Sequence, residues 1–491
     1  MFRLLFTSLF LIYSMLTAQS NSEFDKYFYD MTLRVDFIFN SNYEKDEVRI
    51  DGLYQYVKFA GSTVNLIDPF DMGKYFVKLY EEETNKLIYS RGFTGLVSEY
   101  KITEPALKGI QKEFFNSALL PLPKESIVLT LERRTRDNKL VQFFSEKINP
   151  KEPGIRPRAY NGKVETANLL INGSTHDKVD FVFVAEGYSD KDKFLYDAEK
   201  FKNILMSQEP FASNIGKFNF RIVYATPSGR SDNILFEDTK LKTVVNTNFE
   251  TLGMNGYLGT KDYKSVMDVT AGIPADHIII LVNSERFGGN GIYNHFCMTT
   301  TDHPNSAKIF LHELGHSFAG LADEYYEDFY SGLQAEYYFP KDVEPLEPNI
   351  TINADPETIK WKSLLSKGID VPTKWNKEVI DSLQINLIKE QIEIEKEVSK
   401  MDESGVDNGV IGEKRSSMFA SLENEADEFK KLYNKKKKKF EGKIGVFEGA
   451  AHYMKGFYRP SFICIMNKTG YDKFCAVCQA AFQRMIDYYT K

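Results

Sequence analysis

The segment HELGH, residues 312–316, carries the residue types of a metal-dependent hydrolase. His312 and His316 are four residues apart, so both imidazoles face the same side of a helix. Two neutral imidazoles at this spacing are suitable ligands for zinc, and Glu313 lies beside them, where it can take a proton from a metal-bound water. The alternative is an ordinary amphipathic helix whose histidines are solvated or packed in the core.

The residues after this segment, SFAGLADEYY, offer a third metal ligand. The apolar run at 309–311 predicts a buried helix around the motif. Gly320 can adopt the positive φ that ends a helix and turns the chain back. Asp323 then follows as an oxygen donor that can reach the same metal. The predicted ligands of Zn²⁺ are therefore the two histidines and Asp323, with Glu313 as the catalytic general base.

The string HELGHSFAGLADEYY resembles peptidase family M64, bacterial zinc peptidases named for an immunoglobulin A peptidase. Other stretches resemble the same family, namely VDFVFVAEGYS near residue 180, GGNGIYN at 288–294, EPNIT at 347–351, and VFEGAAHYMKGFYRP leading into CIM at 464–466. The motif is also similar to the metzincin pattern HExxHxxGxxH/D, but Gly320 and Asp323 each fall one residue later. The resemblance implies a metzincin-like zinc peptidase with Met466 in a tight turn beneath the metal.

These features predict a zinc-dependent endopeptidase that hydrolyses peptide bonds of protein substrates, with Glu313 moving the proton from water to the leaving amine. The oxyanion-stabilising group is open among Tyr325, Tyr458 and Arg459. One alternative is a gluzincin-type peptidase whose third ligand is a downstream glutamate such as Glu448. Another is a non-catalytic surface-binding protein that uses this part of the chain as a scaffold.

The N-terminus has the features of a secretory signal peptide. Arg3 precedes the apolar stretch 4–16, and small residues follow at 17–18, so residues 1–18 are predicted to be removed on export. That stretch is too short to span a bilayer, and no later run of about 18 apolar residues occurs. We therefore expect a chain secreted to the extracellular space or periplasm, without a transmembrane segment in its mature form.

The composition is that of an ordinary globular protein, with 42% hydrophobic and 27% charged residues. A net charge of −7 is mild for 491 residues and gives no reason to expect nucleic acid as a partner. The predicted partners are protein or peptide substrates, host glycoproteins among them. The oligomeric state is left open.

The patterning along the chain predicts an α+β protein. Short runs of period two, such as 33–37, 75–79 and 127–131, indicate an N-terminal antiparallel β-sandwich over residues 22–155, interpreted as an accessory domain. After a linker, apolar strands at 179–184, 219–225 and 277–282 alternate with helices, as in a metzincin-like α/β peptidase domain over residues 160–491.

Two further segments have predicted roles within that peptidase domain. Residues 288–294 lie where metzincin-like folds have an edge strand that aligns substrate, although a plain glycine-rich turn fits the residues equally well. Residues 375–440 are dense in Glu and Lys with apolar residues at helical spacing, which predicts a charged helical insertion shaped as a hairpin. Its basic run at 435–439 is interpreted as a solvated helix end.

Four cysteines, Cys297, Cys464, Cys475 and Cys478, complete the residues with chemical potential. In an exported chain, disulfides are the expected state, and the favoured bridge joins Cys464 to one member of the CxxC pair. A second zinc site is not expected, because it would need a fourth cysteine and Cys297 is distant in sequence.

Overall fold

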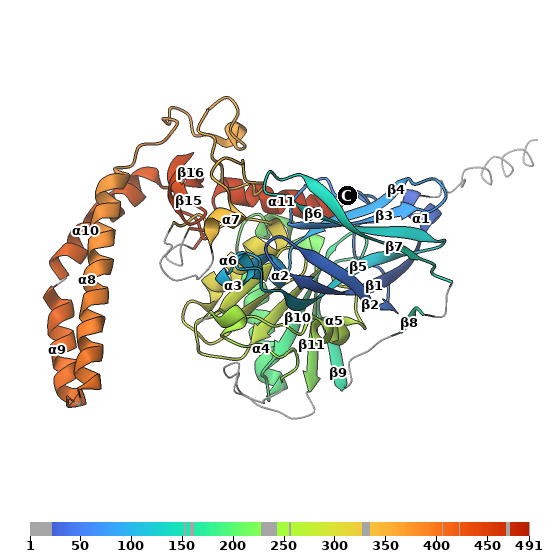
Figure 1. The fold of residues 1–491 in the computed structure, drawn as a ribbon, viewed down its shortest axis with the longest axis horizontal. Helices are drawn as coiled ribbons and strands as arrows, with labels where there is room; N and C mark the ends of the chain where they lie inside the picture. Colours follow the sequence, from blue (N-terminus) through green and yellow to red (C-terminus); the bar gives the residue numbers. More distant parts are fainter. Residues whose placement is uncertain are drawn as a thin grey trace, which may run out of the picture.

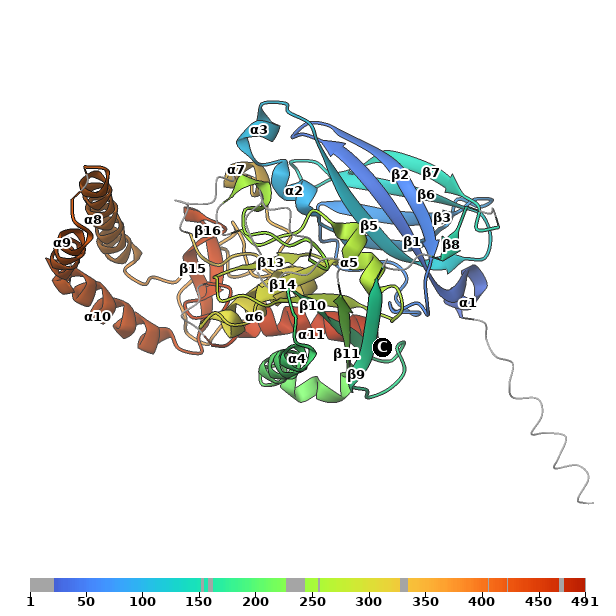
Figure 2. The ribbon, with the colours of Figure 1, turned by 90° about the horizontal axis from the view of Figure 1, so that it is seen from below.

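The computed structural model describes residues 22–490, except 152–153, 158–161, 227–242, 255–256, 327–333, 405, 422 and 468–471. The predicted signal peptide, residues 1–18, lies outside the described residues. The fold is mixed α+β, with antiparallel sheets in the N-terminal part followed by an α/β region, which agrees with the predicted class at that level. Figures 1 and 2 show a layered body from which a helical arm extends.

The N-terminal part, here called the β module, comprises two four-stranded sheets, ordered β5-β1-β2-β8 and β4-β3-β6-β7. Their inner faces contact each other, since the ring of Phe39 lies 5.3 Å from Tyr75 and the ring of Phe37 lies 6.3 Å from Phe144. The three predicted strands lie within β1, β3 and β6. The elements are α1 Glu23–Tyr27, β1 Phe28–Ser41, β2 Asp46–Gln55, β3 Tyr75–Glu81, β4 Leu87–Phe93, α2 Leu96–Tyr100, α3 Glu104–Leu107, β5 Lys112–Pro123, β6 Ile127–Arg134, β7 Leu140–Ile148 and β8 Arg156–Pro157.

The α/β region is built on a six-stranded sheet, ordered β13-β14-β12-β10-β11-β9. Strands β11, β10, β12 and β14 are parallel, whereas β9 and β13 run antiparallel to their neighbours at the two edges. Its elements are β9 Lys163–Leu170, β10 Val179–Glu186, α4 Lys191–Met206, β11 Phe218–Thr226, α5 Tyr263–Thr270, β12 His277–Val282, β13 Gly289–Ile292, β14 Phe296–Thr300 and α6 Ser306–Ala319, with 3₁₀ helices η1 Ala212–Lys217 and η2 Thr251–Gly253.

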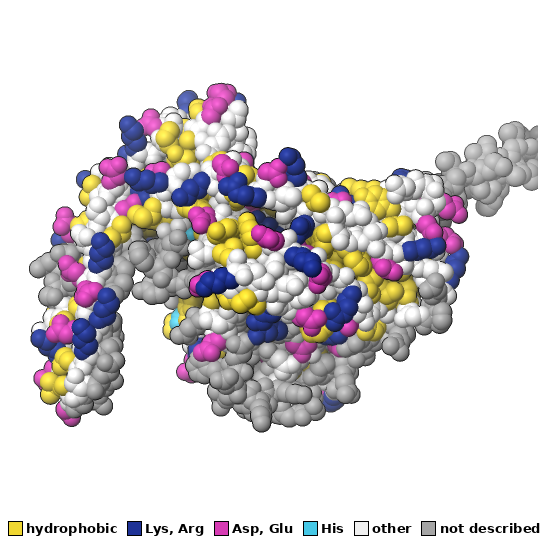
Figure 3. All heavy atoms as spheres, viewed as in Figure 1, with side chains coloured by type: hydrophobic (Ala, Val, Ile, Leu, Met, Phe, Trp, Pro, Cys, Tyr) yellow, Lys and Arg dark blue, Asp and Glu magenta, His cyan; other side chains and the backbone are white. Residues whose placement is uncertain are grey.

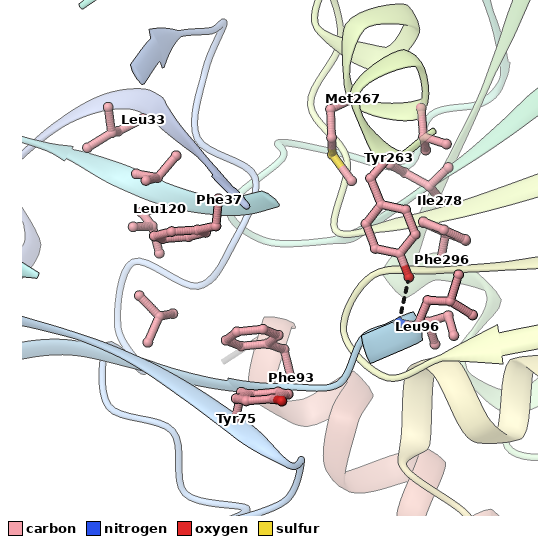
Figure 4. Close-up of a cluster of buried hydrophobic side chains, with 14 of the residues drawn as sticks. Leu33, Phe37, Tyr75, Phe93, Leu96, Leu120, Tyr263, Met267, Ile278 and Phe296 are labelled. Carbon is pink, nitrogen blue, oxygen red and sulfur yellow. Dashed lines mark hydrogen bonds between the residues drawn. The ribbon is translucent and has the colours of Figure 1, made fainter. Parts of the chain in front are cut away.

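Both faces of this sheet are covered, which explains the nearly continuous apolar sequence of β10. Phe181 and Phe183 pack on the side of helices α4, α6 and α11. Val182 and Val184 point to the other side and join one continuous cluster with α5 and the β module, including Phe37. Figure 4 shows this shared cluster, and Figure 2 shows the resulting order of layers.

A buried ion-pair network also joins the β module to α5. The guanidinium of Arg34 contacts Asp36 at 2.5 and 2.6 Å and Asp268 at 2.5 Å, and it also donates to the hydroxyl of Tyr56. Because each charge is taken out of water only in the docked arrangement, this network specifies how the two parts meet.

The remaining chain forms the arm and completes the body. Helix α8 leads outward and α9 and α10 return along it, with apolar contacts that include Leu387, Ile394 and Phe429. Cationic and anionic side chains are interspersed over the arm (Figure 3). Among the described helices, none is long and apolar enough to cross a membrane. These elements are α7 Ala335–Tyr338, α8 Lys377–Glu403, α9 Asn408–Ser421, α10 Glu423–Phe440, β15 Ile444–Ala450, β16 Tyr453–Ser461 and α11 Ala476–Thr490, with 3₁₀ helix η3 Lys362–Leu364.

Candidate metal centre

Helix α6 carries the HELGH segment on one side and buries the other against the sheet. Phe310 and Phe318 on this helix pack against Phe201 and Phe181. Gly320 ends the helix with φ 61°, and the Leu321 N–H donates to the Gly315 carbonyl at 3.0 Å. This left-handed cap is favourable for glycine, which has no Cβ. The one-residue departure from the metzincin spacing is therefore accommodated by a helix that continues to Ala319 before the chain turns.

The turn brings Asp323 to the two histidines. The Nε2 atoms of His312 and His316 are 3.1 Å apart, and Asp323 Oδ1 lies 3.0 Å from the first and 3.4 Å from the second. Three ligand atoms held tetrahedrally at 2.0–2.1 Å from zinc would lie about 3.3 Å from one another. The spacing of these donors therefore fits a zinc ion.

Hydrogen bonds on the far side of each ring orient the imidazoles. His312 Nδ1 lies 3.1 Å from the Ile465 carbonyl, and His316 Nδ1 lies 2.7 Å from the Leu321 carbonyl. A carbonyl only accepts, so each Nδ1 carries the proton and each Nε2 presents a lone pair toward Asp323. This is the tautomer that a metal ligand requires.

The charges of the site shift the pKa values of its members. Burial alone would lower the pKa of His316, but the carboxylate of Asp323 outweighs it and raises the pKa to about 9. Burial raises the pKa of Glu313, and the neighbouring histidines only partly offset this. A carboxyl whose pKa is moved toward neutrality is suited to accept and return a proton near neutral pH.

His452 is a member of this site that the sequence analysis did not single out. Its Nε2 lies 3.4 Å from Asp323 Oδ2, the carboxylate oxygen that faces away from the other histidines. The ring of Tyr325 lies 5.1 Å from that of His452 and stacks 6.2 Å from that of His312. His452 sits in the turn between β15 and β16 with φ 66°, and only its presence in the family-like stretch VFEGAAHYMKGFYRP could have drawn attention to it.

Met466 lies directly against the metal-binding helix. A Cβ placed on Gly315, between the two histidines, would meet the Met466 sulfur at 2.5 Å. The Met466 side chain is fully buried, and its carbonyl accepts from the Glu324 N–H at 2.8 Å. The predicted position of Met466 beneath the histidine pair is thus present, and its contact is one of packing.

A cleft of about 800 Å³ opens over these residues. One wall is β13, the edge strand of the sheet, packed so closely on α6 that a Cβ on Gly291 would meet the Glu313 carbonyl oxygen at 2.2 Å. The β module supplies another wall, including Met72 and Glu99. Burial and then the charge of Glu313 raise the pKa of Glu99 to about 8, and its carboxyl accepts from the Tyr257 hydroxyl. The β module therefore contributes to the cleft, whereas its sequence had suggested only an accessory role.

The other candidates from the sequence lie apart from this cleft or on its wall. Of the three oxyanion candidates, Tyr325 lines the cleft. Tyr458 pairs through its backbone with Thr351, and Arg459 donates to the Gly449 carbonyl. Glu448, the alternative third ligand, accepts instead from the Gly456 N–H at 3.1 Å.

The cysteines differ from the prediction. All four are free and buried, so the expected disulfide between Cys464 and the CxxC pair is wrong. The proximity behind that expectation is correct, since Cys464 Sγ lies 3.7 Å from Cys478 Sγ. The three C-terminal cysteines gather around Glu324, a grouping that was missed because only cysteines were counted as ligands for a second metal.

Comparison with known proteins gives two family matches along the chain. A family profile described as IgA Peptidase M64 matches residues 167–486. A second profile, described as Peptidase M64 N-terminus, matches residues 23–145. No curated protein matches the chain.

Proposed function

The chain belongs to the M64 peptidase family, and from this premise we propose that it is a secreted, zinc-dependent endopeptidase acting on proteins. Membership makes it a protease, and peptidases of this family are zinc-dependent in general. The observation that carries the proposal for this chain is the triangle of His312, His316 and Asp323, whose donor atoms lie 3.0 to 3.4 Å apart. A bound zinc would supply Lewis acidity toward water and the scissile carbonyl.

In this proposal Glu313 is the general base. It follows His312 on the helix and lines the same cleft, so its carboxylate can accept a proton from the attacking water and return it to the leaving amine. His452 holds the outer oxygen of Asp323, which leaves the inner oxygen for the metal. Tyr325 is the preferred donor to the developing oxyanion, because it lines the cleft beside the histidines.

The substrate is proposed to lie along β13. This strand forms an edge of the sheet and a wall of the cleft, so an extended peptide can add to it through backbone hydrogen bonds. Backbone recognition accepts many sequences, and side-chain preference would then come from the cleft walls, including the part formed by the β module.

We further propose the finer organisation on which this function rests. The β module, residues 22–155, is interpreted as a β-sandwich, and residues 160–491 as a metzincin-like peptidase domain with residues 375–440 inserted. Residues 1–18 are proposed to direct export. Mass analysis of the N-terminus of exported protein would test the cleavage site.

The proposal is tested by zinc content and peptidase activity of matched variants. Glu313→Gln keeps the side-chain shape, so we expect unchanged zinc content with kcat lower by about 10²–10⁴-fold. Asp323→Ala should instead release zinc to a chelator more readily, whereas Glu448→Ala should not. Wild-type turnover by Glu313→Gln would refute the assigned base, and zinc loss in Glu448→Ala alone would favour the gluzincin-type alternative.

A further inference from the structure

A second group of metal-ligating side chains lies next to the site just described. Glu324, Cys464, Cys475 and Cys478 each present one ligand atom, and these four atoms all lie within 4.8 Å of one another. Glu324, Cys464 and Cys478 have no exposed surface, and Cys475 is 8% exposed. The group is therefore enclosed by protein on all sides.

The separations match a tetrahedral metal site better than a disulfide. Cys478 Sγ lies 3.7 Å from Cys464 Sγ, 3.6 Å from Cys475 Sγ and 3.2 Å from Glu324 Oε1. Tetrahedral ligands on zinc, with Zn–S near 2.3 Å and Zn–O near 2.0 Å, place neighbouring sulfurs about 3.8 Å apart and sulfur and oxygen about 3.5 Å apart. A disulfide would bring one pair of sulfurs to about 2.0 Å and leave the third thiol unused.

The carboxylate supplies an independent reason to expect a cation. Glu324 is fully buried, and its Oε2 has no hydrogen-bond partner among the described residues. Its Oε1 accepts from Asn349 Nδ2 at 3.1 Å. The nearest positive side chain in its surroundings, Arg459, donates to the Gly449 carbonyl instead. An unpaired buried carboxylate is costly, and a bound cation removes that cost.

We propose that Glu324, Cys464, Cys475 and Cys478 form a second, structural zinc site. Three thiolates and one carboxylate complete a closed set of four ligands, with no position left for water, as in structural zinc sites. Thiolates favour zinc over the hard cations Mg²⁺ and Ca²⁺. Each thiol releases its proton on binding, and the Cys475 N–H, 3.4 Å from Cys464 Sγ, donates to one of the resulting thiolates.

The position of this site explains what it would do. Asp323 and Glu324 are consecutive, yet one faces the histidines and the other faces the cysteines. Cys464 is followed by Ile465, whose carbonyl orients His312. The second site thus fastens the segment carrying the third catalytic ligand to the turn that orients the first, and it also attaches both to helix α11 through Cys478.

Metal analysis in a background without the first site tests this proposal. The full mature chain with His312→Ala and His316→Ala, purified without a histidine tag and passed over a chelating resin, should retain about one zinc ion per chain. Adding Cys478→Ser should remove it. Adding Cys297→Ser, which changes a buried cysteine outside the group, should not.

Three results would overturn the site. One is a histidine-depleted protein that carries no zinc when it is folded by circular dichroism. A second is retention of that zinc after Cys478→Ser. The third is an intact mass, after denaturation and alkylation, that shows two of the cysteines joined in a disulfide.

A spectroscopic measurement covers the case in which the cysteine variant does not fold. Replacing zinc by Co²⁺ in the histidine-depleted protein should give thiolate-to-cobalt charge-transfer absorption and tetrahedral d–d bands. X-ray absorption of the zinc form should show sulfur neighbours at about 2.3 Å. A first shell of nitrogen and oxygen only would exclude the cysteines as ligands. Because all these readouts are independent of peptide cleavage, they leave the proposed peptidase function to its own test.

Discussion

Replacing Gly291 by alanine tests how closely the edge strand must lie on the metal-binding helix. The added Cβ would lie 2.2 Å from the Glu313 carbonyl oxygen and 2.9 Å from His316 Cβ. Neither atom can move by changing a rotamer, so β13 and α6 must separate. Ordinary contact begins at 3.4 Å, and the required shift is therefore about 1.2 Å.

The expected cost follows from two opposing effects. Overpacking of this kind destabilises by about 1–3 kcal/mol. Alanine also restricts the unfolded chain, which returns about 0.4–1 kcal/mol. We expect a net loss of about 1–2 kcal/mol. Because a displacement of about 1 Å between the catalytic base and the strand that aligns substrate can lower catalysis by about 10²-fold, kcat/KM should fall by that order.

The assay compares Gly291→Ala with Gly272→Ala, whose added Cβ meets nothing within 4 Å. Thermal unfolding, zinc content and kcat/KM on a fluorogenic peptide are measured for both. The expected pattern is a lower Tm and a lower kcat/KM for Gly291→Ala, with zinc retained because its ligands all lie outside β13. Equal Tm and kcat/KM in the two variants would refute the close packing of β13 on α6 and remove the basis for substrate alignment along that strand.

Four other changes have outcomes that the geometry predicts. His452→Asn should weaken zinc retention by about 10–100-fold in chelator competition, because Asp323 loses the partner of its outer oxygen. Tyr325→Phe should lower kcat by about 10²–10³-fold with zinc content unchanged, and full activity would exclude its hydroxyl as oxyanion donor. Gly320→Ala, at φ 61°, should lower stability by about 1–2 kcal/mol, measured as a lower Tm. Burial lowers the pKa of His277 to about 3 and that of His295 to about 4. Both folded pKa values lie below the unfolded value of about 6.5, so the stability contribution is full above that pH and falls by about 2 kcal/mol per histidine at pH 5. Urea unfolding between pH 5 and 7.5 should show this slope, and the slope should be flatter in His277→Gln.

The parts of the site that sequence could predict depend on local geometry. A spacing of four residues places His312 and His316 on one side of any helix, and a glycine turn returns Asp323 within a few residues. The strands of the central sheet were predictable for a similar reason, because strands covered on both faces are apolar throughout. Even the difference at the start of α4, where Asp190 rather than the predicted Ser189 is the N-cap, is one residue between two good capping types.

What sequence could not predict depends on contacts between distant segments. His452 reaches Asp323 only because the β15–β16 hairpin folds back over α6, and no local pattern records that pairing. Glu324 could be assigned to the cysteines only once the Met466 turn was seen to accept its backbone N–H. The same holds for Glu99, which enters the cleft through the docking of the whole β module.

The shared core described above has a consequence for how the protein is made. The β module and the central sheet bury one continuous apolar cluster, in which Phe37 from the first and Val182 from the second take part. A chain synthesised from its N-terminus would present the β module first, with part of its apolar surface still uncovered. That surface would be covered only when the strands of the peptidase part arrive. Cleavage competence would therefore arise late, after the substrate-binding cleft has received walls from both halves, and the emerging chain would be protected from its own activity until it is complete.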